Sequence, residues 1–164
     1  MEANKEKKFE KAMFGAGCFW HVEQAFGKVD GVVETAVGYA GGSMKNPKYE
    51  DVCSDETGHA EVVEVTYNPS KVKYEKLLDV FWNIHDPTQL NKQGHDVGTQ
   101  YRSVIFYFNG QQKKKAIESK NMLEKSKKYS KPIATEIKPA AQFFRAEEYH
   151  QKYLQKRGLF SCAI

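Results

Sequence analysis

Gly15-Ala16-Gly17-Cys18-Phe19-Trp20 is the stretch of this 164-residue chain that joins the first predicted strand to the first predicted helix. Upstream, residues 9–14 indicate a short strand, and downstream the apolar residues of 19–26 recur at the spacing of one helical face. Cys18 is therefore predicted to lie on a strand-to-helix turn, where the unpaired N–H groups of the helix favour a thiolate over a thiol. This position makes it a candidate nucleophile, although a lone cysteine is often a small buried apolar side chain.

The overall composition is typical of one soluble domain. Apolar residues make up 40% of the chain and charged residues 28%, and no apolar run approaches the roughly 20 residues that a membrane span requires. The polar N-terminus is not followed by the apolar segment of a secretory signal. Three cysteines at wide separations are not the pattern of a disulfide framework, which favours a reducing compartment. We therefore expect a single domain over residues 1–164 in the cytoplasm, with residues 1–8 frayed and 158–164 a mobile tail.

The net charge of +4 comes from one segment. Residues 111–131 hold eight lysines and two glutamates, a surplus of six, so the rest of the chain sums to about −2. The segment lacks the interleaved aromatic residues and the motifs of nucleic-acid binding. We interpret it as a helix with a solvated lysine face and expect neither nucleic acid nor membrane as a partner. Outside enzymes, the alternative is an anion-binding module that uses this helix.

The hydrophobic periodicity predicts strands that alternate with helices. Residues 101–108 are apolar on both parities, which is typical of a strand covered on both faces. Polar, turn-forming loops fill 41–58 and 88–100, and both can converge on Cys18. The pattern predicts an α/β (α+β) fold, a two-layer sandwich with long coil segments. The predicted strands are 9–14, 33–39, 59–67, 101–108 and 133–137, and the predicted helices are 19–26, 74–84, 111–131 and 147–155.

Two carboxylates lie in the predicted strand 59–67. Glu61 and Glu64 point to opposite faces because a strand has a period of two. Glu61 shares its face with Val63 and Val65, and apolar neighbours disfavour the charged form of a carboxylate, which suits a general acid. Glu64 is predicted to be a solvated or salt-bridged surface group. The alternative for Glu61 is an edge carboxylate without a chemical role.

Other polar side chains fall at strand ends and in the loops. Tyr39 closes one predicted strand and Tyr101 opens another, each beside a glycine-containing loop, where a phenol can donate a hydrogen bond to a substrate oxygen. Most of the nine tyrosines are nevertheless expected to be packing residues. Asp96 lies in a loop between glycines, where it can also cap a turn.

The five histidines are scattered, without metal-ligand spacing, so no metal site is predicted. A cysteine protease or amidase would need a histidine base for Cys18. The familiar local signatures of those nucleophiles are absent, which leaves His59 and His95 as candidate partners in space.

Five separate stretches resemble the A-type peptide methionine sulfoxide reductases, over about residues 10 to 155. They are Gly-Cys-Phe-Trp (17–20), Gly-Tyr-Ala-Gly-Gly (38–42), Cys-Ser-Asp-Glu-Thr-Gly-His-Ala-Glu (53–61), Asp-Val-Gly-Thr-Gln-Tyr-Arg-Ser (96–103) and Glu-Glu-Tyr-His-Gln-Lys-Tyr-Leu (147–154). Each motif alone is a weak signal, whereas five in the same order are specific.

The resemblance implies reduction of methionine sulfoxide, free or in proteins, with the S epimer expected, and hence repair of oxidatively damaged proteins. Cys18 would attack the sulfoxide sulfur, and Glu61 would supply a proton to the oxygen. Tyr39 and Tyr101 would hydrogen-bond the same oxygen. Cys18 would be left as a sulfenic acid, which a second thiol converts to a disulfide.

The same resemblance implies the remaining contacts and partners. Phe19 and Trp20 would cradle the substrate methyl group, and Asp96 would be an additional binding-site carboxylate. The implied fold is a ferredoxin-like two-layer sandwich with a mixed sheet. No cofactor is implied, because a thiol reductant, thioredoxin, acts as co-substrate. The expected partners are oxidised proteins or peptides, free methionine sulfoxide and thioredoxin, and a monomer is expected.

The chain departs from the family pattern at His21 and Asp55, where the family commonly has glycine. His21 would alter the rim of the pocket or the chemistry of the nearby thiol. Cys162 is predicted to resolve the sulfenic acid, with an external thiol as the alternative, and Cys53 is predicted to be a buried structural thiol. The competing enzyme functions are another thiol-dependent activity of Cys18, such as a peroxidase-like reductase, or an amidase.

Overall fold

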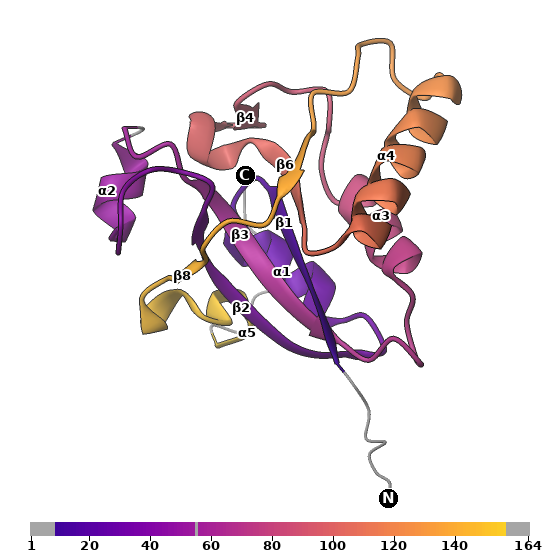
Figure 1. Cartoon of the computed structure of the whole chain (residues 1–164). Helices are drawn as coiled ribbons and strands as arrows, with labels where there is room; N and C mark the ends of the chain where they lie inside the picture. The colour runs from indigo at the N-terminus through magenta and orange to yellow at the C-terminus, as the bar shows by residue number, and fades with distance from the viewer. Residues whose placement is uncertain (1–8, 55, 157–164) are drawn as a thin grey trace, which may run out of the picture.

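The computed structural model describes residues 9–54 and 56–156 of the chain. The strands, which can be followed by colour in Figure 1, are β1 (Glu10–Ala16), β2 (Val32–Ala40), β3 (Ala60–Tyr67), β4 (Lys92–Gln93), β5 (Asp96–Val97), β6 (Ser103–Tyr107), β7 (Glu136–Pro139) and β8 (Phe144–Arg145). The helices are α1 (Phe19–Gly27), α2 (Tyr49–Cys53), α3 (Tyr74–Asn83), α4 (Gly110–Lys125) and α5 (Tyr153–Lys156), with 3₁₀ turns at Thr99–Tyr101 and Glu148–His150. Within the described ranges, none of the helices has the length and apolar character needed to cross a membrane.

One six-stranded sheet organises the molecule, in the order β7-β6-β1-β3-β2-β8. Its neighbouring strands are antiparallel except β6 and β7, which are parallel, so the sheet is mixed. The elements β1-α1-β2-β3-α3-β6 form the ferredoxin-like unit, with its four strands in the spatial order β6-β1-β3-β2. The predicted fold class, a two-layer sandwich with a mixed sheet, is therefore confirmed.

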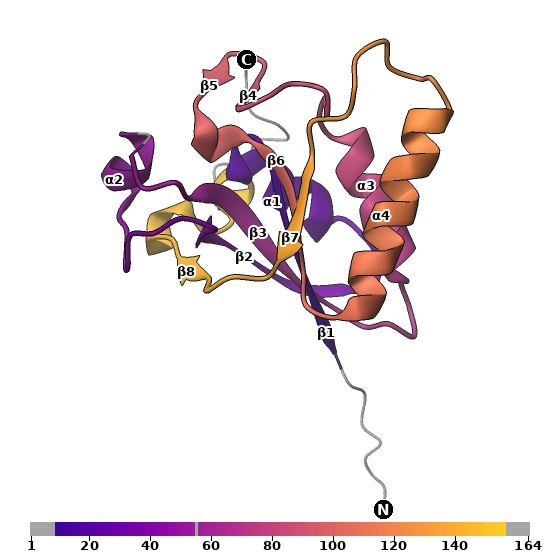
Figure 2. The same cartoon turned by 45° about the horizontal axis from the view of Figure 1, so that its top comes forward.

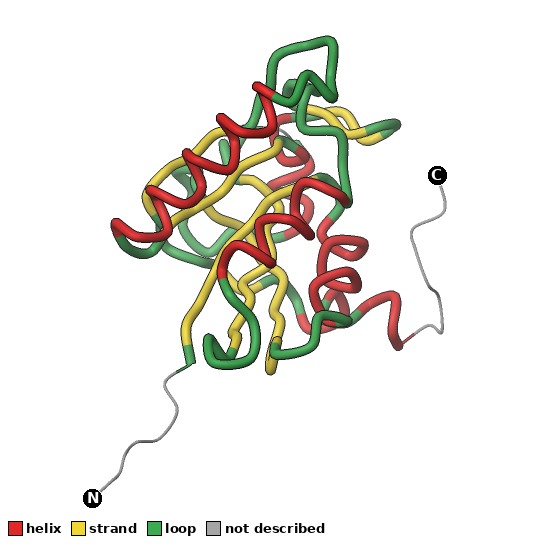
Figure 3. The backbone as a smooth tube through the Cα atoms, turned by 90° about the vertical axis from the view of Figure 1, so that its right-hand side faces the viewer, coloured by secondary structure: helices red, strands yellow, loops and turns green. Residues whose placement is uncertain are grey.

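The helices α1 and α3 pack on one face of this sheet. Figure 3 shows helices, in red, lying alongside the strands, in yellow. Alternate residues of β1 explain the choice of face. Phe14 points toward the helices and stacks on Phe26 of α1, with ring centroids 4.9 Å apart, and it also contacts Phe81 of α3 at 5.3 Å. Met13 points to the opposite face, where the coil around Phe143 covers a smaller apolar cluster. Burial of each large apolar side chain contributes roughly 1.5–3 kcal/mol to folding.

The strand predicted to be covered on both faces is β6. Ile105 lies in the core under the helices, and Val104 and Phe106 lie in the cluster on the other face, all of them buried. β6 lies between β1 and β7 in the sheet. The two-sided apolar pattern of residues 101–108 therefore predicted its position correctly.

The lysine-rich segment forms α4, which ends at Lys125 rather than at residue 131. Most of its lysines are exposed, as predicted for a solvated face. Two others make structural contacts, because Lys115 forms an ion pair with Glu75 of α3 at 2.6 Å and Lys120 donates to the carbonyl of Thr135 at 3.1 Å. The segment therefore also ties α4 to α3 and to the approach of β7.

Other predictions of secondary structure were also wrong. The loop predicted over 88–100 contains the β4–β5 hairpin and a 3₁₀ turn. The loop predicted over 41–58 contains α2, whose first turn is closed by the Asp51 carboxylate, which accepts from the Lys48 backbone N–H at 2.9 Å. The strand predicted at 133–137 is β7, shifted toward the C-terminus. The helix predicted over 147–155 is a 3₁₀ turn followed by the four-residue α5, because Lys152 has a positive φ of 52° between them. The predictions for residues 1–8, Asp55, Cys162 and the tail 158–164 lie outside the described residues.

Candidate active site

Cys18 lies between β1 and α1 and is the N-cap residue of this nine-residue helix. Its side chain is half-buried, and its carbonyl accepts from the Val22 backbone N–H at 3.4 Å. The first turn of α1 contains no acidic side chain. The predicted strand-to-helix turn is thus confirmed.

Glu61 lies in β3 on the face of the sheet that α1 covers, and only 2% of it is exposed. Its Oε1 accepts a hydrogen bond of 3.2 Å from the backbone N–H of Phe19, the residue after Cys18. Glu64 points to the opposite face and forms an ion pair with Lys11 at 3.3 Å. The period-two prediction, which separated a buried Glu61 from a surface Glu64, is correct.

Tyr39 is paired directly with Glu61 across the β2–β3 ladder, so the two side chains share one face. Its hydroxyl donates to Oε1 of Glu147 at 3.2 Å. Burial is the main cause that raises the pKa of Tyr39 far above its usual range, followed by the negative charges of Glu147 and Glu61. Tyr39 therefore stays protonated at physiological pH and acts as a hydrogen-bond donor rather than a base.

Tyr101 ends the 3₁₀ turn that precedes β6. Burial raises its pKa well above the usual range, and the charges of nearby side chains raise it further; these are Glu61, Cys53, Asp96 and Cys18, in decreasing order. Each of these groups must lie near the phenol to act on it. The fold therefore brings Cys18, Glu61, Tyr101 and Asp96 together, from four separate stretches of the chain.

The loop that carries Asp96 is fixed over the Cys18 turn by Gln93. Its amide forms two hydrogen bonds with the backbone of Asp86, accepting from the N–H at 2.8 Å and donating to the carbonyl at 2.9 Å. Its Cβ and Cγ lie 3.0 Å from the position of a Cβ on Gly17, which has a φ of +96°. Figure 2 shows the β4–β5 hairpin, which pairs Gln93 with Asp96, at the end of the sheet where α1 begins.

Arg102 joins the two long loops of the site. Its guanidinium donates to the carbonyl of Gly58, just before β3, at 3.0 Å and to the carbonyl of Thr99 at 2.8 Å. The expected convergence of the loops is therefore produced by a side chain that sequence reasoning did not single out. The signal available was its place directly after Tyr101 in the motif of residues 96–103.

The two aromatic residues after Cys18 have different environments. Phe19 is 1% exposed and packs its ring against those of Tyr39 and His150, with centroids 5.7 and 5.3 Å away. Trp20 is half-buried; its indole N–H donates to Nδ1 of His150 at 3.0 Å, and its ring stacks on Tyr153 at 3.8 Å. Phe19 thus supports the site from the core, whereas Trp20 keeps an accessible ring surface beside it.

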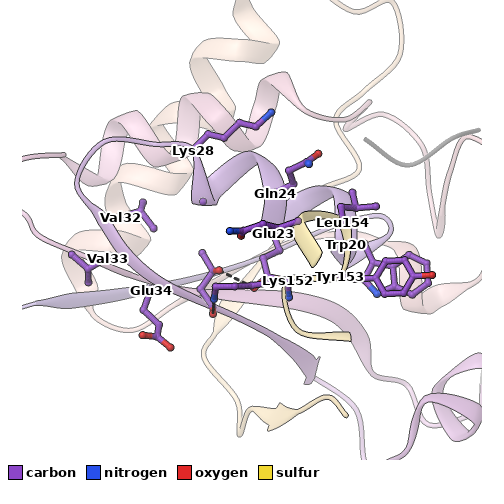
Figure 4. Close-up of a pocket in the computed structure, with 13 residues that line it drawn as sticks. Trp20, Glu23, Gln24, Lys28, Val32, Val33, Glu34, Lys152, Tyr153 and Leu154 are labelled. Carbon is purple, nitrogen blue, oxygen red and sulfur yellow. Dashed lines mark hydrogen bonds between the residues drawn. The ribbon is translucent and has the colours of Figure 1, made fainter. Parts of the chain in front are cut away.

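A cavity of about 510 Å³ lies beside Trp20, between α1, the start of β2 and α5. Figure 4 shows Trp20 and Tyr153 at one end of this cavity and Glu23 at its wall. Both carboxylate oxygens of Glu23 are used, because they accept from the Thr35 hydroxyl at 2.8 Å and from the Lys152 backbone N–H at 2.7 Å. Neither Cys18 nor Glu61 lines this cavity, whereas Trp20 does.

The histidine partner that a cysteine hydrolase would need is not provided by His59. This side chain is buried, its Nδ1 accepts from the Gly42 N–H at 3.0 Å, and its Nε2–H donates to the Met44 carbonyl at 2.6 Å. Both nitrogens therefore hold the loop after β2. His95, the other candidate, is exposed on the 88–100 loop. No group of three or more potential metal-ligating side chains occurs in the described part of the chain.

The prediction for Cys53 was wrong in one respect. Its side chain is exposed rather than buried, because α2 turns the neighbouring Val52 into the core instead. Burial nevertheless raises the pKa of its thiol, a hydrogen bond from Tyr49 lowers it, and the charges of Glu61 and Glu50 raise it again, with a net increase. Cys53 therefore lies close to the site but carries little thiolate at neutral pH.

Comparison with known proteins agrees with this geometry. The sequence model of the family described as peptide methionine sulfoxide reductase matches residues 10–164. A protein of Methanothermobacter thermautotrophicus named peptide methionine sulfoxide reductase MsrA is 62% identical over 157 residues, which cover 96% of this chain and 93% of that protein.

Solved structures give the same result. Mxr1 of Saccharomyces cerevisiae in its reduced form has a TM-score of 0.87 at 37% identity, covering 96% of this chain and 90% of that chain. Mxr1 in complex with Trx2 has a TM-score of 0.63 at 26% identity, covering 93% and 89%. The strand-to-helix turn at Cys18, the buried carboxylate of Glu61 and the match over nearly the whole length lead to one conclusion: this chain belongs to the peptide methionine sulfoxide reductase family of oxidoreductase enzymes.

Proposed function

We propose that the chain, acting as one domain over residues 1–164, reduces the S epimer of methionine sulfoxide, free or in proteins, with Cys18 as the nucleophile. The single observation that carries the proposal is the position of Cys18 at the N-terminus of α1, with the carboxylate of Glu61 bonded to the next backbone N–H at 3.2 Å. A thiolate and an acid are thereby held at the same helix end.

In the proposed reaction, the sulfur of Cys18 attacks the sulfoxide sulfur while Glu61 protonates the oxygen, which is a poor leaving group until it gains a proton. The attack forms a bond between the two sulfur atoms; the protonated oxygen then leaves the methionine sulfur and bonds to the sulfur of Cys18 while the sulfur–sulfur bond breaks, so methionine is released and Cys18 is left as a sulfenic acid. The sulfoxide sulfur gains two electrons and the cysteine sulfur loses two. Glu61 is buried, so it delivers its proton in a site from which water is largely excluded.

The other site residues bind the substrate in this scheme. Tyr101 hydrogen-bonds the sulfoxide oxygen, and Tyr39 does so when its hydroxyl proton turns from Glu147 to the substrate. Both phenols remain protonated because burial raises their pKa. Trp20 contacts the methyl group through its accessible ring face, with Phe19 behind it. Asp96 contributes a further binding carboxylate from the β4–β5 hairpin.

The reductant we propose is thioredoxin, because the related Mxr1 forms a complex with Trx2. Thioredoxin reduces a disulfide that Cys162 forms with the oxidised Cys18, and no other cofactor takes part. The enzyme works as a monomer in the cytoplasm, where oxidised proteins and free methionine sulfoxide are its substrates.

The test is incubation of the full chain with a peptide that contains one methionine sulfoxide, as separated S and R epimers, with dithiothreitol as reductant. Mass spectrometry is expected to show loss of one oxygen atom from the S epimer and none from the R epimer. Absence of oxygen loss from either epimer would overturn the proposal. Equal loss from both would overturn the stereochemical part. The same assay on Cys18→Ser is the control for the nucleophile.

A further inference from the structure

The motif of residues 147–154 has no role in the reaction described above, yet it lies against the site. Three of its side chains reach across to other elements. Glu147 accepts from the Tyr39 hydroxyl at 3.2 Å and from the Tyr49 backbone N–H at 3.0 Å. Gln151 accepts from the Val37 N–H at 2.8 Å and donates to the Val37 carbonyl at 2.9 Å. His150 receives the indole N–H of Trp20.

His150 is the member of this group closest to the residues after Cys18. It is 3% exposed, and its ring contacts those of Phe19, Trp20 and Tyr49, with centroids 5.3, 5.5 and 4.6 Å away. Its Nδ1 accepts the hydrogen bond from the Trp20 indole N–H at 3.0 Å. A buried imidazole thus meets the aromatic residue proposed to bind the substrate methyl group.

The hydrogen bond determines the tautomer of His150. Because Nδ1 accepts, the proton of the neutral ring lies on Nε2. That nitrogen is buried, has no hydrogen-bond partner within the described ranges, and lies 3.9 Å from Oε1 of Glu147. The carboxylate favours the proton on the nitrogen that faces it and so leaves Nδ1 available to Trp20.

Two contacts together define the orientation of the indole. Stacking on Tyr153, with an interplanar angle of 11°, fixes the plane of the ring. The bond to His150 fixes the rotation within this plane. Without this acceptor, the indole N–H would hydrogen-bond to water instead, and the half-buried ring would be free to adopt other rotamers.

We propose that His150 is a positioning residue, which holds the Trp20 indole in the orientation that binds the substrate methyl group. The proposal rests on the proposed function for the role of Trp20 in binding. A methyl contact is made in both the ground state and the transition state, so its loss raises KM and leaves kcat nearly unchanged. One hydrogen bond of this kind corresponds to roughly a 3- to 10-fold rise in KM.

The experiment compares His150→Asn, His150→Gln and His150→Leu. The asparagine Oδ1 lies near the place of Nδ1 and can accept from Trp20, whereas the glutamine amide reaches toward the place of Nε2, and leucine has no acceptor. All three are made in a Trp82→Phe background, which leaves Trp20 as the one tryptophan of a chain that has two. Trp82 lies on α3 and donates to Ser119, away from the site.

The readouts are the Trp20 emission, its quenching by acrylamide, and KM and kcat for a methionine sulfoxide peptide.

We expect the variants His150→Leu and His150→Gln to have a KM about 3- to 10-fold higher than the parent, with kcat within about twofold. Acrylamide is expected to quench Trp20 more strongly in both. In His150→Asn, KM and the quenching of Trp20 are expected to stay close to those of the parent. The proposal is overturned if asparagine and glutamine behave alike, or if leucine changes neither the emission nor KM. If His150→Leu does not fold, the comparison of His150→Asn with His150→Gln still tests the proposal. The fluorescence readout needs no turnover, so a parent enzyme without reductase activity would overturn the proposed function while the orientation of Trp20 is still tested.

A double-mutant cycle removes the remaining ambiguity. If His150 acts through Trp20, then His150→Gln changes KM in the parent but adds nothing in a Trp20→Phe background. Additive effects would show that His150 acts on the site by a route other than the indole and would overturn the proposal.

Discussion

Oε1 of Glu61 accepts a hydrogen bond of 3.2 Å from the backbone N–H of Phe19, the first residue of α1 and the direct neighbour of Cys18. A helix leaves its first N–H groups without internal partners, and this carboxylate satisfies one of them. The bond therefore joins β3 to the turn that carries the thiol. The carboxylate of Glu61 is therefore held one residue from Cys18 by a direct bond to the backbone of α1.

The role of this carboxylate is tested by Glu61→Gln, with Glu64→Gln as the matched control on the same strand. The amide keeps an oxygen for the Phe19 N–H but cannot release a proton, so we expect kcat/KM to fall about 10²- to 10⁴-fold. Glu64 forms only a surface ion pair with Lys11, so its substitution is expected to be nearly neutral. Similar losses in the two variants would contradict the assignment of the acid.

For the nucleophile, we predict that Cys18→Ser has no reductase activity and an unchanged free energy of unfolding. A hydroxyl is a far weaker nucleophile and cannot form the sulfenic acid. Activity is measured by oxygen loss from a methionine sulfoxide peptide, and stability by urea denaturation. Residual turnover above about a hundredth of the parent's would assign the chemistry to another residue.

Gly17→Ala is predicted to lower the free energy of unfolding by about 1–3 kcal/mol and to reduce activity as well. The reason is twofold, because Gly17 has a φ of +96° and a Cβ there would lie 3.0 Å from the Gln93 side chain. Gly94→Ala is the control, since Gly94 also has a positive φ, of +61°, but no atom within 4 Å of the added Cβ. Equal effects on activity would show that contact with Gln93 does not matter.

These residues show what the sequence could and could not predict. Cys18 and Glu61 were placed correctly because their positions depend on local periodicity, 3.6 residues in α1 and two in β3. Glu147 and His150 were missed because their partners are distant in sequence, 108 residues from Glu147 to Tyr39 and 130 from His150 to Trp20. No local pattern encodes such a pair, and their motif gave the only signal.

The predicted helix over residues 147–155 failed for a related reason. The side chain of Gln151 bonds the backbone of Val37 in β2, and Lys152 adopts a φ of 52° so that its N–H reaches Glu23 at 2.7 Å. Tertiary hydrogen bonds replace those of a helix in this segment. In α2, a five-residue helix, the opposite happened, because local capping by Asp51 produced a helix where the polar composition had predicted a loop.

A further prediction concerns stability at acidic pH. His85 donates or accepts through both ring nitrogens, with the Phe81 carbonyl at 2.7 Å and the Ser103 hydroxyl at 2.8 Å, and burial lowers its pKa from 6.5 to about 4. The unfolded chain therefore binds a proton below pH 6.5 that the native state accepts only near pH 4. As the pH falls through this window, the free energy of unfolding is expected to decrease, and the titration of His85 contributes up to about 3 kcal/mol of this decrease.

The check is urea denaturation of the parent and of His85→Gln across the same range of pH. The variant has no titrating ring, so the decrease between pH 6.5 and about 4 is expected to be smaller than in the parent. Carboxylates titrate in both proteins and cancel in the difference. Curves that run parallel over this window would contradict the prediction.

The last prediction concerns the thiol that resolves the oxidised enzyme, for which the chain offers Cys53 and Cys162. Attack on a sulfenic acid requires a thiolate. Burial, together with the charges of Glu61 and Glu50, raises the pKa of Cys53 despite its hydrogen bond from Tyr49, so little of it is ionised at neutral pH. Cys53 is also the last residue of α2, whose position is fixed by the bond from the Tyr49 N–H to Glu147 at 3.0 Å. Both properties disfavour it as the attacking group.

We therefore predict that one equivalent of methionine sulfoxide, added without reductant, yields a Cys18–Cys162 disulfide in peptide mapping. Cys162→Ser is expected to complete its first turnover, stop at the sulfenic acid, and lose most of its activity with thioredoxin while keeping more with dithiothreitol, which attacks the sulfenic acid directly. Cys53→Ser, the matched control, is expected to retain thioredoxin-dependent turnover. Two results would contradict the choice of Cys162: full thioredoxin-dependent activity in its serine variant, which would point to an external thiol, or a Cys18–Cys53 bond in the unmodified chain.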